Sequence, residues 1–268
     1  MNKILDYRQI LNRKHALNRG LVSEWVALPG LAGGKYFFDV CGQNHGTLTN
    51  GPTWQGPLGR PGGFGSLKFG NDTSNYVAAT TSATLTTGWT NSAWIWIHPN
   101  ATNSSFHEIV SYQGGFALTI FKDTTTAIIR YFDGTAYDTG FVLSASRWHH
   151  VLVTHGTGQN LQIWIDGVRQ VNTAKATVSQ MPVDGIGLGE SSGRYWMGYL
   201  DEIRITAAYT PDGMVPYLES RLGNPNRYNW IDISKLTQVQ IRELYYRYNM
   251  FKSPVLTGIR SRDDEENQ

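Results

Sequence analysis

The sequence of 268 residues has little of three things: cysteine, charge and long apolar runs. Its one cysteine, Cys41, cannot form an intramolecular disulfide, which excludes a cysteine framework and a cysteine-based zinc cluster. No run approaches the ~20 apolar residues that a membrane span requires. The first twenty residues are basic and polar, without the apolar core of a secretion signal. We therefore expect synthesis in the cytoplasm, no membrane insertion, and a fold held by packing alone.

Charged residues make up 16% of the chain, and the net charge of +2 is unevenly distributed. Residues 1–19 carry five Lys or Arg against one acid, whereas residues 20–222 carry eleven against fourteen. The basic character thus belongs to an amino-terminal arm. Such an arm can contact nucleic acid, but so few charges more often keep an extended segment solvated. We therefore do not expect a nucleic-acid partner.

Short runs with apolar alternation, or rich in β-branched and aromatic residues, recur between turn signals, a pattern typical of a sandwich or barrel. Asp-Gly pairs at 133–134, 166–167 and 184–185 tolerate the positive φ of tight hairpins, and the second pair gives the strongest hairpin prediction. The predicted strands are Leu21–Leu28, Asn75–Ala79, Ser92–His98, His107–Tyr112, Phe116–Phe121, Thr125–Tyr131, Trp148–His155, Leu161–Ile165, Gly185–Leu188 and Trp196–Ile205.

Two regions break this strand pattern. The Gly- and Pro-dense stretch Gly51–Gly65 predicts an irregular loop, because Pro removes a backbone donor and Gly weakens regular structure. After the last predicted strand, Thr210 as N-cap and Pro211 at the first position predict a helix that ends near Gly223. A second helix is predicted over Lys235–Phe251, followed by a disordered acidic end.

Several segments, in order along the chain, resemble the laminin-G-like or concanavalin A-like jelly-roll family. They are Leu21–Trp25 with Asp39 and Asn44–Leu48, Ser66–Gly70 with Tyr76 and Val77, Ala93–Ile97, Arg147–Val151, Leu161–Gly167 and Gly198–Ile205. The resemblance implies an all-β fold, a concanavalin A-like antiparallel β-sandwich (jelly roll) over residues 20–222. A basic N-terminal arm (1–19) precedes it, and a short C-terminal helical extension (223–268) follows.

The sequence does not predict an enzyme. Glucanases of this fold carry their carboxylates on one strand in an E-x-D-x-x-E pattern, because retaining hydrolysis needs two carboxyl groups about 5–5.5 Å apart. That pattern is absent, as are G-x-S-x-G, H-E-x-x-H and P-loop motifs. Glu108 and the pair Asp201-Glu202 lack suitable partners. The resemblance instead implies structural roles, with Asp201 bonded to nearby backbone and Glu202 facing Arg204 or solvent.

A lectin-like role would use polar aromatic loops such as residues 131–137. Flat aromatic faces stack on the C–H surfaces of a sugar ring, while Asp and Asn accept hydroxyl protons. Tryptophans inside strand patterns, by contrast, are more often core or sheet-face residues than sugar platforms. The predicted ligand-binding residues are Tyr112, Tyr131, Asp133, Tyr137 and Trp196.

The resemblance also implies calcium. Asn71 and Asp72 offer oxygen ligands of the hard type that calcium prefers. The Gly-Asn-Asp sequence replaces the more acidic form usual in the family, so we expect weak binding. No other cofactor is expected.

The two extensions favour a role in assembly, because a closed sandwich does not need them. Phage virion proteins are made in the cytoplasm and released by lysis, and the segment Asp6–His15 resembles the start of laminin-G-like proteins among phage and environmental sequences. The tail is aromatic-rich, as interface cores are. The predicted assembly-interface residues are Tyr7, Arg8, Arg13, Tyr228, Trp230, Tyr245, Tyr248 and Phe251.

We therefore predict a homo-oligomeric, non-enzymatic structural protein of a virion, either a capsid decoration or a tail appendage, with affinity for cell-surface glycans. Its other partners would be virion proteins. Two alternatives stay open. The chain can be a stand-alone carbohydrate-binding module, and the C-terminal helix can pack on its own sandwich as a lid.

Overall fold

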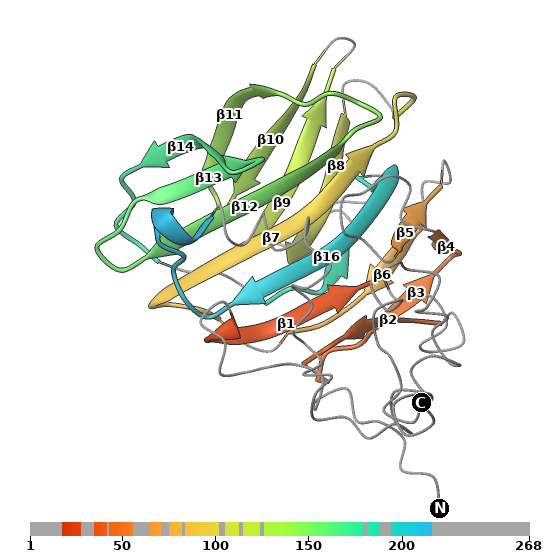
Figure 1. Ribbon diagram of the computed structural model, residues 1–268, viewed down its shortest axis with the longest axis horizontal. Helices are drawn as coiled ribbons and strands as arrows, with labels where there is room; N and C mark the ends of the chain where they lie inside the picture. Colours follow the sequence, from red (N-terminus) through yellow and green to blue (C-terminus); the bar gives the residue numbers. More distant parts are fainter. Residues whose placement is uncertain are drawn as a thin grey trace, which may run out of the picture.

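The computed structural model describes residues 18–27, 35–41, 43–55, 65–70, 75–81, 84–101, 105–112, 115–123, 126–178, 182–187 and 194–215. Within these ranges the chain forms antiparallel strands in two layers, which confirms the predicted β-sandwich (Figure 1). The strands are β1 (Leu21–Val26), β2 (Tyr36–Asp39), β3 (Gly46–Thr49), β4 (Thr53–Gln55), β5 (Ser66–Phe69), β6 (Tyr76–Ala78), β7 (Gly88–Ile97), β8 (Ser105–Tyr112), β9 (Phe116–Lys122), β10 (Ala127–Phe132), β11 (Ala136–Val142), β12 (Trp148–Gly156), β13 (Leu161–Ile165), β14 (Val168–Thr173), β15 (Gly185–Ile186) and β16 (Gly198–Thr206).

The two layers are called here the front sheet and the back sheet. The front sheet has the order β1-β16-β7-β12-β13-β14, with β5 and then β4 paired beside β16. The back sheet has the order β11-β10-β9-β8-β15-β6-β3-β2. Strand β2 pairs with both β1 and β3, so it links the two sheets at one edge. In Figure 1 the front sheet lies toward the viewer and β8, β9 and β10 lie behind it.

The core lies between the sheets and follows the period-two alternation of the strands. In β10, Ala127, Ile129 and Tyr131 are buried, and the residues between them are half-buried. The largest side chains that are fully buried include Trp25, Trp89 and Trp196. Cys41 is a free cysteine, so no disulfide stabilises the fold. Aromatic side chains therefore supply much of the stabilising packing.

Part of the outer face of the front sheet is also apolar. Trp94 and Trp148 occupy positions that alternate with core residues, yet they are only 7% and 8% exposed. They pack together with the partly buried Trp96 and Tyr199. The expectation that strand tryptophans are scaffold residues is thus confirmed for Trp94 and Trp148.

The Asp166-Gly167 hairpin is confirmed. Both residues have positive φ, 49° and 73°, and they join β13 to β14 as a two-residue turn. The side chain of Asp166 also accepts hydrogen bonds from the backbone amide of His150 at 2.9 Å and from Nδ1 of His149 at 2.7 Å. The tight-turn prediction for Asp184-Gly185 is wrong, because Gly185 begins β15 and pairs with both β6 and β8; the same pairing confirms the start of the predicted strand Gly185–Leu188.

Two buried carboxylates organise the backbone near β1. Asp39 is fully buried and accepts hydrogen bonds from the amides of Glu24 and Cys41, both at 2.9 Å. Asp201 accepts from the amides of Ala27 and Glu202, both at 2.8 Å, which confirms its predicted structural role.

Glu202 departs from its predicted environment. It is 6% exposed rather than solvent-facing, and its φ of 46° lies within a register shift of β16. Arg204, the other predicted neighbour of Glu202, pairs with Glu24 at 3.0 Å and donates to the side chain of Asn18 at 3.1 Å. The shift in register explains the difference, since it changes which side chains of β16 share a face.

Strand β4 corrects part of the predicted Gly51–Gly65 loop, because Thr53–Gln55 pairs with β5. The predicted helix start is also corrected. Pro211 is the cap residue, without a side-chain cap, and Asp212–Met214 form a short 3₁₀ turn. Thr210 does not cap it, since its hydroxyl lies 2.8 Å from that of Thr90. The C-terminal extension, including the helix Lys235–Phe251, lies outside the described residues.

Candidate functional site

A hollow of about 450 Å³ lies beside the turn from β12 to β13. Its walls come from that turn, from β13 and β14, and from the segment that follows β16. The residues that line it are Gly158, Gln159, Asn160, Gln162, Asn172, Tyr209, Pro211 and Asp212. Four of these eight carry side-chain amides, so we call it the amide hollow.

Strand alternation places the amides on the outer side of the front sheet. Gln162 stands between two core residues of β13, so its own side chain points away from the core. Its Oε1 accepts a hydrogen bond from Nε1 of Trp164 at 3.0 Å. Nδ2 of Asn160 donates to Oδ1 of Asn172 at 2.9 Å. These bonds orient the amides, and each amide has further donor or acceptor positions.

The opposite wall is held to β7 and β12 by hydroxyl groups. Oγ1 of Thr90 lies 2.8 Å from Oγ1 of Thr154 and 2.8 Å from Oγ1 of Thr210. The backbone amide of Thr210 donates to Thr154 at 3.0 Å. A side chain at Gly156 would come within 2.8 Å of Cβ of Tyr209, so glycine there lets Tyr209 lie against β12. The wall is thus fixed by two central strands.

Asp212 is the one carboxylate among the residues that line the hollow, and two donors hold it. Nη1 of Arg169 donates to Oδ2 at 2.6 Å, and the hydroxyl of Tyr209 donates to Oδ1 at 3.4 Å. The Arg169 guanidinium also lies 5.5 Å from the ring of Trp164. Burial and the charge of Asp212 raise the pKa of Tyr209, which therefore stays protonated at neutral pH. The ion pair compensates the charge of Asp212.

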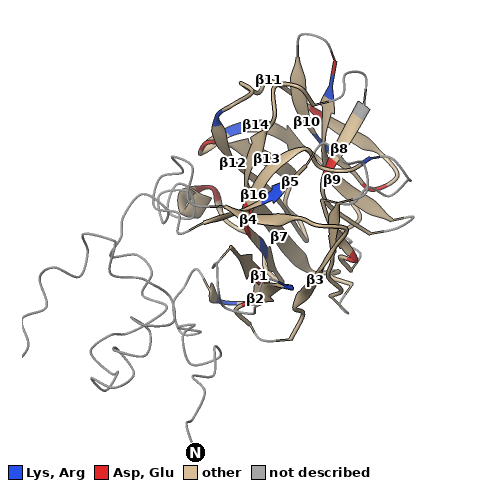
Figure 2. Cartoon of the chain, turned by 90° about the vertical axis from the view of Figure 1, so that its right-hand side faces the viewer, with Lys and Arg blue, Asp and Glu red and all other residues tan. Residues whose placement is uncertain are grey.

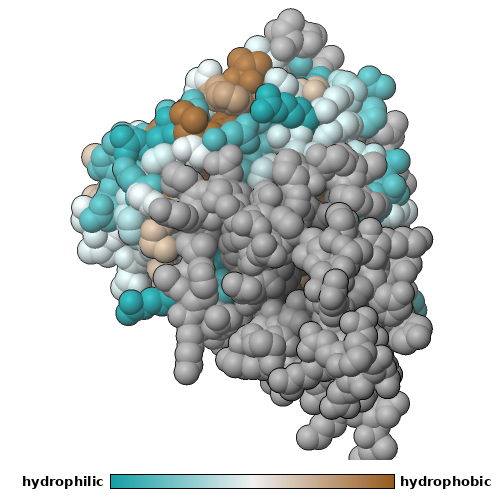
Figure 3. Space-filling view, in the orientation of Figure 1, coloured by the Kyte–Doolittle hydropathy of each residue, from teal (hydrophilic) through white to brown (hydrophobic). Residues whose placement is uncertain are grey.

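Charge is sparse over the rest of the described surface as well. Most strand residues are uncharged (Figure 2). On the face shown in Figure 3 the described surface is mainly hydrophilic, with apolar residues gathered in a small area.

Three predicted ligand residues meet at the β10–β11 hairpin. The rings of Tyr131 and Tyr137 stack with centroids 6.1 Å apart, and Nζ of Lys175 lies 3.2 Å from Oδ2 of Asp133. Lys175 also lies 5.6 Å from the ring centroid of Tyr137. Tyr131, however, is fully buried, and burial together with Asp133 raises its pKa well above the ordinary value. We call these four residues the hairpin cluster; Asp133 and Tyr137 are its half-buried predicted members.

The other predicted site residues do not join this cluster on the surface. Trp196 is fully buried in the core, and Tyr112 is partly buried and packs against the core. Trp196 therefore offers no ring face to a ligand. Asn71 and Asp72 lie outside the described residues. So do the assembly residues Tyr7, Arg8, Arg13, Tyr228, Trp230, Tyr245, Tyr248 and Phe251.

The hairpin cluster and the amide hollow belong to the same end of the sandwich. Nε2 of His155, near the end of β12, lies 3.1 Å from the carbonyl oxygen of Lys175. The side chain of Lys175 in turn forms the ion pair with Asp133 in the hairpin cluster. Two residues after His155 the chain enters the turn that lines the hollow. The sequence prediction found the hairpin and missed the hollow. The sequence signal for the hollow was the run of side-chain amides in Gln159–Gln162, where Leu161 between two of the amides is a core residue.

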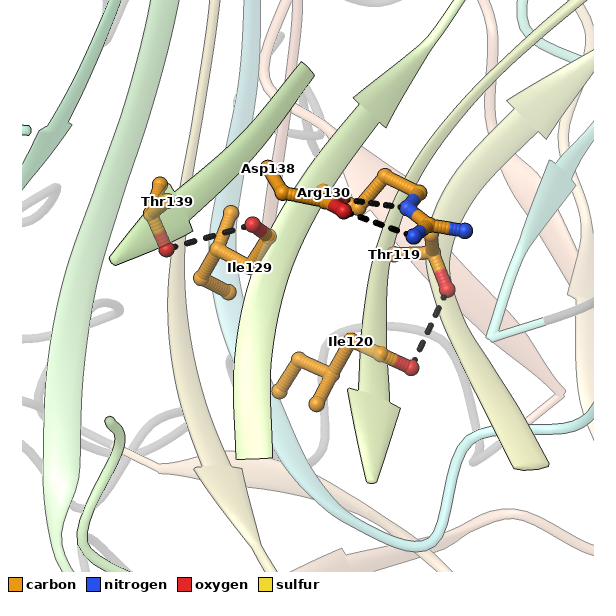
Figure 4. A network of polar contacts seen from close by, with 6 residues as sticks. All are labelled: Thr119, Ile120, Ile129, Arg130, Asp138 and Thr139. Atoms are coloured by element: carbon orange, nitrogen blue, oxygen red, sulfur yellow. Dashed lines mark hydrogen bonds and ion pairs between the residues drawn. The ribbon is translucent and has the colours of Figure 1, made fainter. Parts of the chain in front are cut away.

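A separate polar network lies on the back sheet. Figure 4 shows the fork of Arg130 on the carboxylate of Asp138, with one nitrogen to oxygen distance of 2.7 Å. The Arg130 guanidinium also lies 5.0 Å from the ring of Phe106, which Arg194 approaches to 4.7 Å. These groups satisfy one another across β8, β10 and β11, which is the usual role of such cross-strand pairs.

No group of three or more His, Cys, Asp or Glu side chains in the described ranges could hold a metal ion. Within the same part of the chain, no helix is long and apolar enough to cross a membrane.

Solved structures with the same fold include three of different origin. The binding domain of Paraclostridial Mosquitocidal Protein 1 matches at 12% identity with a TM-score of 0.54, over 75% of this chain and 52% of that one. Trypanosoma rangeli sialidase matches at 13% identity with a TM-score of 0.53, over 75% of this chain and 32% of the sialidase. The third is domain 4 of AbnA, an extracellular arabinanase from Geobacillus stearothermophilus, in complex with arabinotriose. It matches at 12% identity with a TM-score of 0.53, over 74% of this chain and 98% of that domain.

The chain thus spans about half of the toxin binding domain and a third of the sialidase. No curated protein matches the sequence. A family model, described as the concanavalin A-like lectin/glucanases superfamily, matches residues 70–212, which is more than half of the chain. The order of strands, the family model and the shared fold agree, and the chain belongs to the concanavalin A-like lectin/glucanases superfamily.

Proposed function

We propose that the protein is a non-catalytic glycan-binding module whose ligand occupies the amide hollow. The observation that carries this proposal is the lining, in which four amides and a tyrosine surround an open space of about 450 Å³. Sugar hydroxyls both donate and accept hydrogen bonds, and a planar amide offers both functions in fixed geometry. The ring of Tyr209 adds an apolar surface for C–H groups.

The absence of a second carboxylate in the lining supports binding without hydrolysis. Glycoside hydrolysis uses two carboxyl groups across the scissile bond, whereas Asp212 stands alone among the lining residues. It is also engaged by Arg169 and Tyr209. The arabinanase domain that shares this fold has arabinotriose bound, which supports a saccharide as ligand class.

The test is binding of the whole chain to an array of oligosaccharides, followed by titration calorimetry of the best ligand. Asn172→Ala should weaken affinity by up to about tenfold, because one or two hydrogen bonds are lost. Gln55→Ala is the matched control, since this side-chain amide on β4 donates to the hydroxyl of Thr53 and lies outside the hollow. Equal affinity of both variants would refute the site, and release of reducing sugar would refute the non-catalytic role.

We also propose a virion-associated assembly role, with this module as the adhesive part of a homo-oligomer. The supporting observation is Val215, which is fully buried and packs on Leu152 and Trp164 on the outer face of the front sheet. The last described residue therefore packs on an apolar part of the sheet face, and the aromatic extension follows it in the sequence. Light scattering should find an oligomer that dissociates when residues 223–268 are removed. A monomer before and after removal would favour the stand-alone module.

Calcium stays a prediction at Asn71 and Asp72. Excess calcium should raise the melting temperature slightly, and chelation should reverse the change. An unchanged melting temperature would remove calcium from the proposal.

A further inference from the structure

We infer that the amide hollow selects neutral sugars and disfavours sugars that carry a carboxylate, sulfate or phosphate group. This inference rests on the proposed glycan-binding function and names its ligand class. It follows from the hydrogen bonds that the lining residues already make and from the place of the one carboxylate among them.

The amides present uncharged donors and acceptors in mixed order. Gln162 uses Oε1 to accept from Trp164, so its NH₂ group is directed to donate. In the Asn160–Asn172 pair, one NH₂ and one carbonyl are used, which leaves the carbonyl of Asn160 and the NH₂ of Asn172. A sugar hydroxyl group can bond to either the NH₂ donors or the carbonyl acceptor, whereas an anionic oxygen can only accept from the donors.

Electrostatics reinforce this preference. Asp212 places a carboxylate in the wall, and the guanidinium that compensates it belongs to Arg169, which is not among the lining residues. An anionic ligand therefore meets the carboxylate without a cation inside the hollow. Like charges about 4 Å apart in water repel by an energy that corresponds to about a fivefold loss of affinity, and the ion pair with Arg169 outside the hollow cancels part of this repulsion.

The charge of Asp212 also provides a specificity switch. In Asp212→Asn, Arg169 loses its charged partner and becomes available to an anion, so binding of acidic sugars should rise by about tenfold or more. Arg169→Gln should act in the opposite direction, because it leaves Asp212 uncompensated and strengthens repulsion. Both residues are half-exposed, with side-chain exposures of 50% and 38%, so the sandwich should tolerate either change.

The experiment uses the full chain and matched panels of neutral oligosaccharides and their sialylated, uronic acid or sulfated counterparts. We expect neutral ligands to bind up to about fivefold more tightly, with little dependence on salt, because no ion pair forms. Melting temperatures of both variants confirm that they are folded.

Tight binding of acidic ligands that Asn172→Ala weakens would overturn the neutral preference while leaving the glycan site intact. An unchanged neutral-to-acidic ratio in both charge variants would overturn it as well. Failure of every glycan to bind would overturn the proposed function itself, so the two failures are distinguishable.

Discussion

The hairpin cluster and the amide hollow lie at one end of the sandwich but use their side chains in opposite ways. In the cluster, Tyr131 is fully buried and Lys175 neutralises Asp133. In the hollow, Asn172 and Asp212 line open space on the outer side of the front sheet. The first region is mainly a part of the core, and the second is a surface that can exchange water for a ligand.

Aromatic residues are dense where this chain packs its core, and amides are dense where it leaves the open hollow that we propose as the ligand site. Trp89 lies 5.3 Å from Tyr131 between ring centroids, and Phe116 lies 6.2 Å from the same ring. The hairpin tyrosine thus closes the end of an aromatic core. Amides at a half-open surface are costly to bury without partners, and for that reason they favour a site that water or hydroxyl groups can fill.

The largest expected effect is the loss of the buried ring. Tyr131→Ala should lower the free energy of unfolding by about 3–5 kcal/mol, because it removes an aromatic side chain from the core. Tyr131→Phe, which keeps the ring, should cost less than about 1 kcal/mol. Urea denaturation measures both. The affinity of the folded fraction should not change in either variant, and a selective loss of affinity in Tyr131→Phe would make the cluster a ligand site after all.

The second effect couples stability to the hollow. Thr154→Val should cost about 1–3 kcal/mol, because the buried hydroxyl that bonds Thr90 and the amide of Thr210 is lost. It should also weaken glycan affinity, since the wall that carries Tyr209 and Asp212 loses its support. Thr49→Val, on an exposed hydroxyl of β3, is the control. Loss of stability with full affinity would show that the wall does not depend on this hydroxyl.

Much of the fold was predictable because it rests on local signals. Period-two alternation identified most of the core strands, and the Asp166-Gly167 pair located a hairpin whose two residues both need positive φ. The failures were also local in origin. Asp184-Gly185 is the same residue pair as Asp166-Gly167, but pairing of β15 with strands on both sides places Gly185 in a central strand.

The amides of the hollow left a signal in the sequence, but the hollow as a whole was not predictable, because its two walls are distant in the sequence. Thr90 and Thr210 are 120 positions apart, and they meet only because β16 pairs with β7 and β7 with β12. No single segment of the sequence predicts the strand order that creates this contact, because the pairing strands are far apart in the chain. Trp196 shows the converse: it lies just before β16 and is fully buried, and its place in the sequence did not tell whether its ring would enter the core or face solvent.

The smallest expected effect is on the pH dependence of the two regions. His155 is fully buried, and burial, with Lys175 beside it, lowers its pKa, although its bond to the Lys175 carbonyl acts in the opposite direction. Below about pH 6.5 the unfolded chain binds a proton that the folded chain resists, so stability present above that pH is lost as the pH falls.

The wild-type melting temperature should therefore drop between about pH 7.5 and about pH 5 by more than that of His155→Gln, which keeps a donor for the same carbonyl. Glycan affinity of the folded protein should stay constant over this range, because the amides of the hollow do not titrate and Tyr209 stays protonated. Calorimetry at both pH values measures the two quantities. An affinity that follows the protonation of His155 would join the two regions into one site, with the hairpin cluster acting on the hollow through the end of β12.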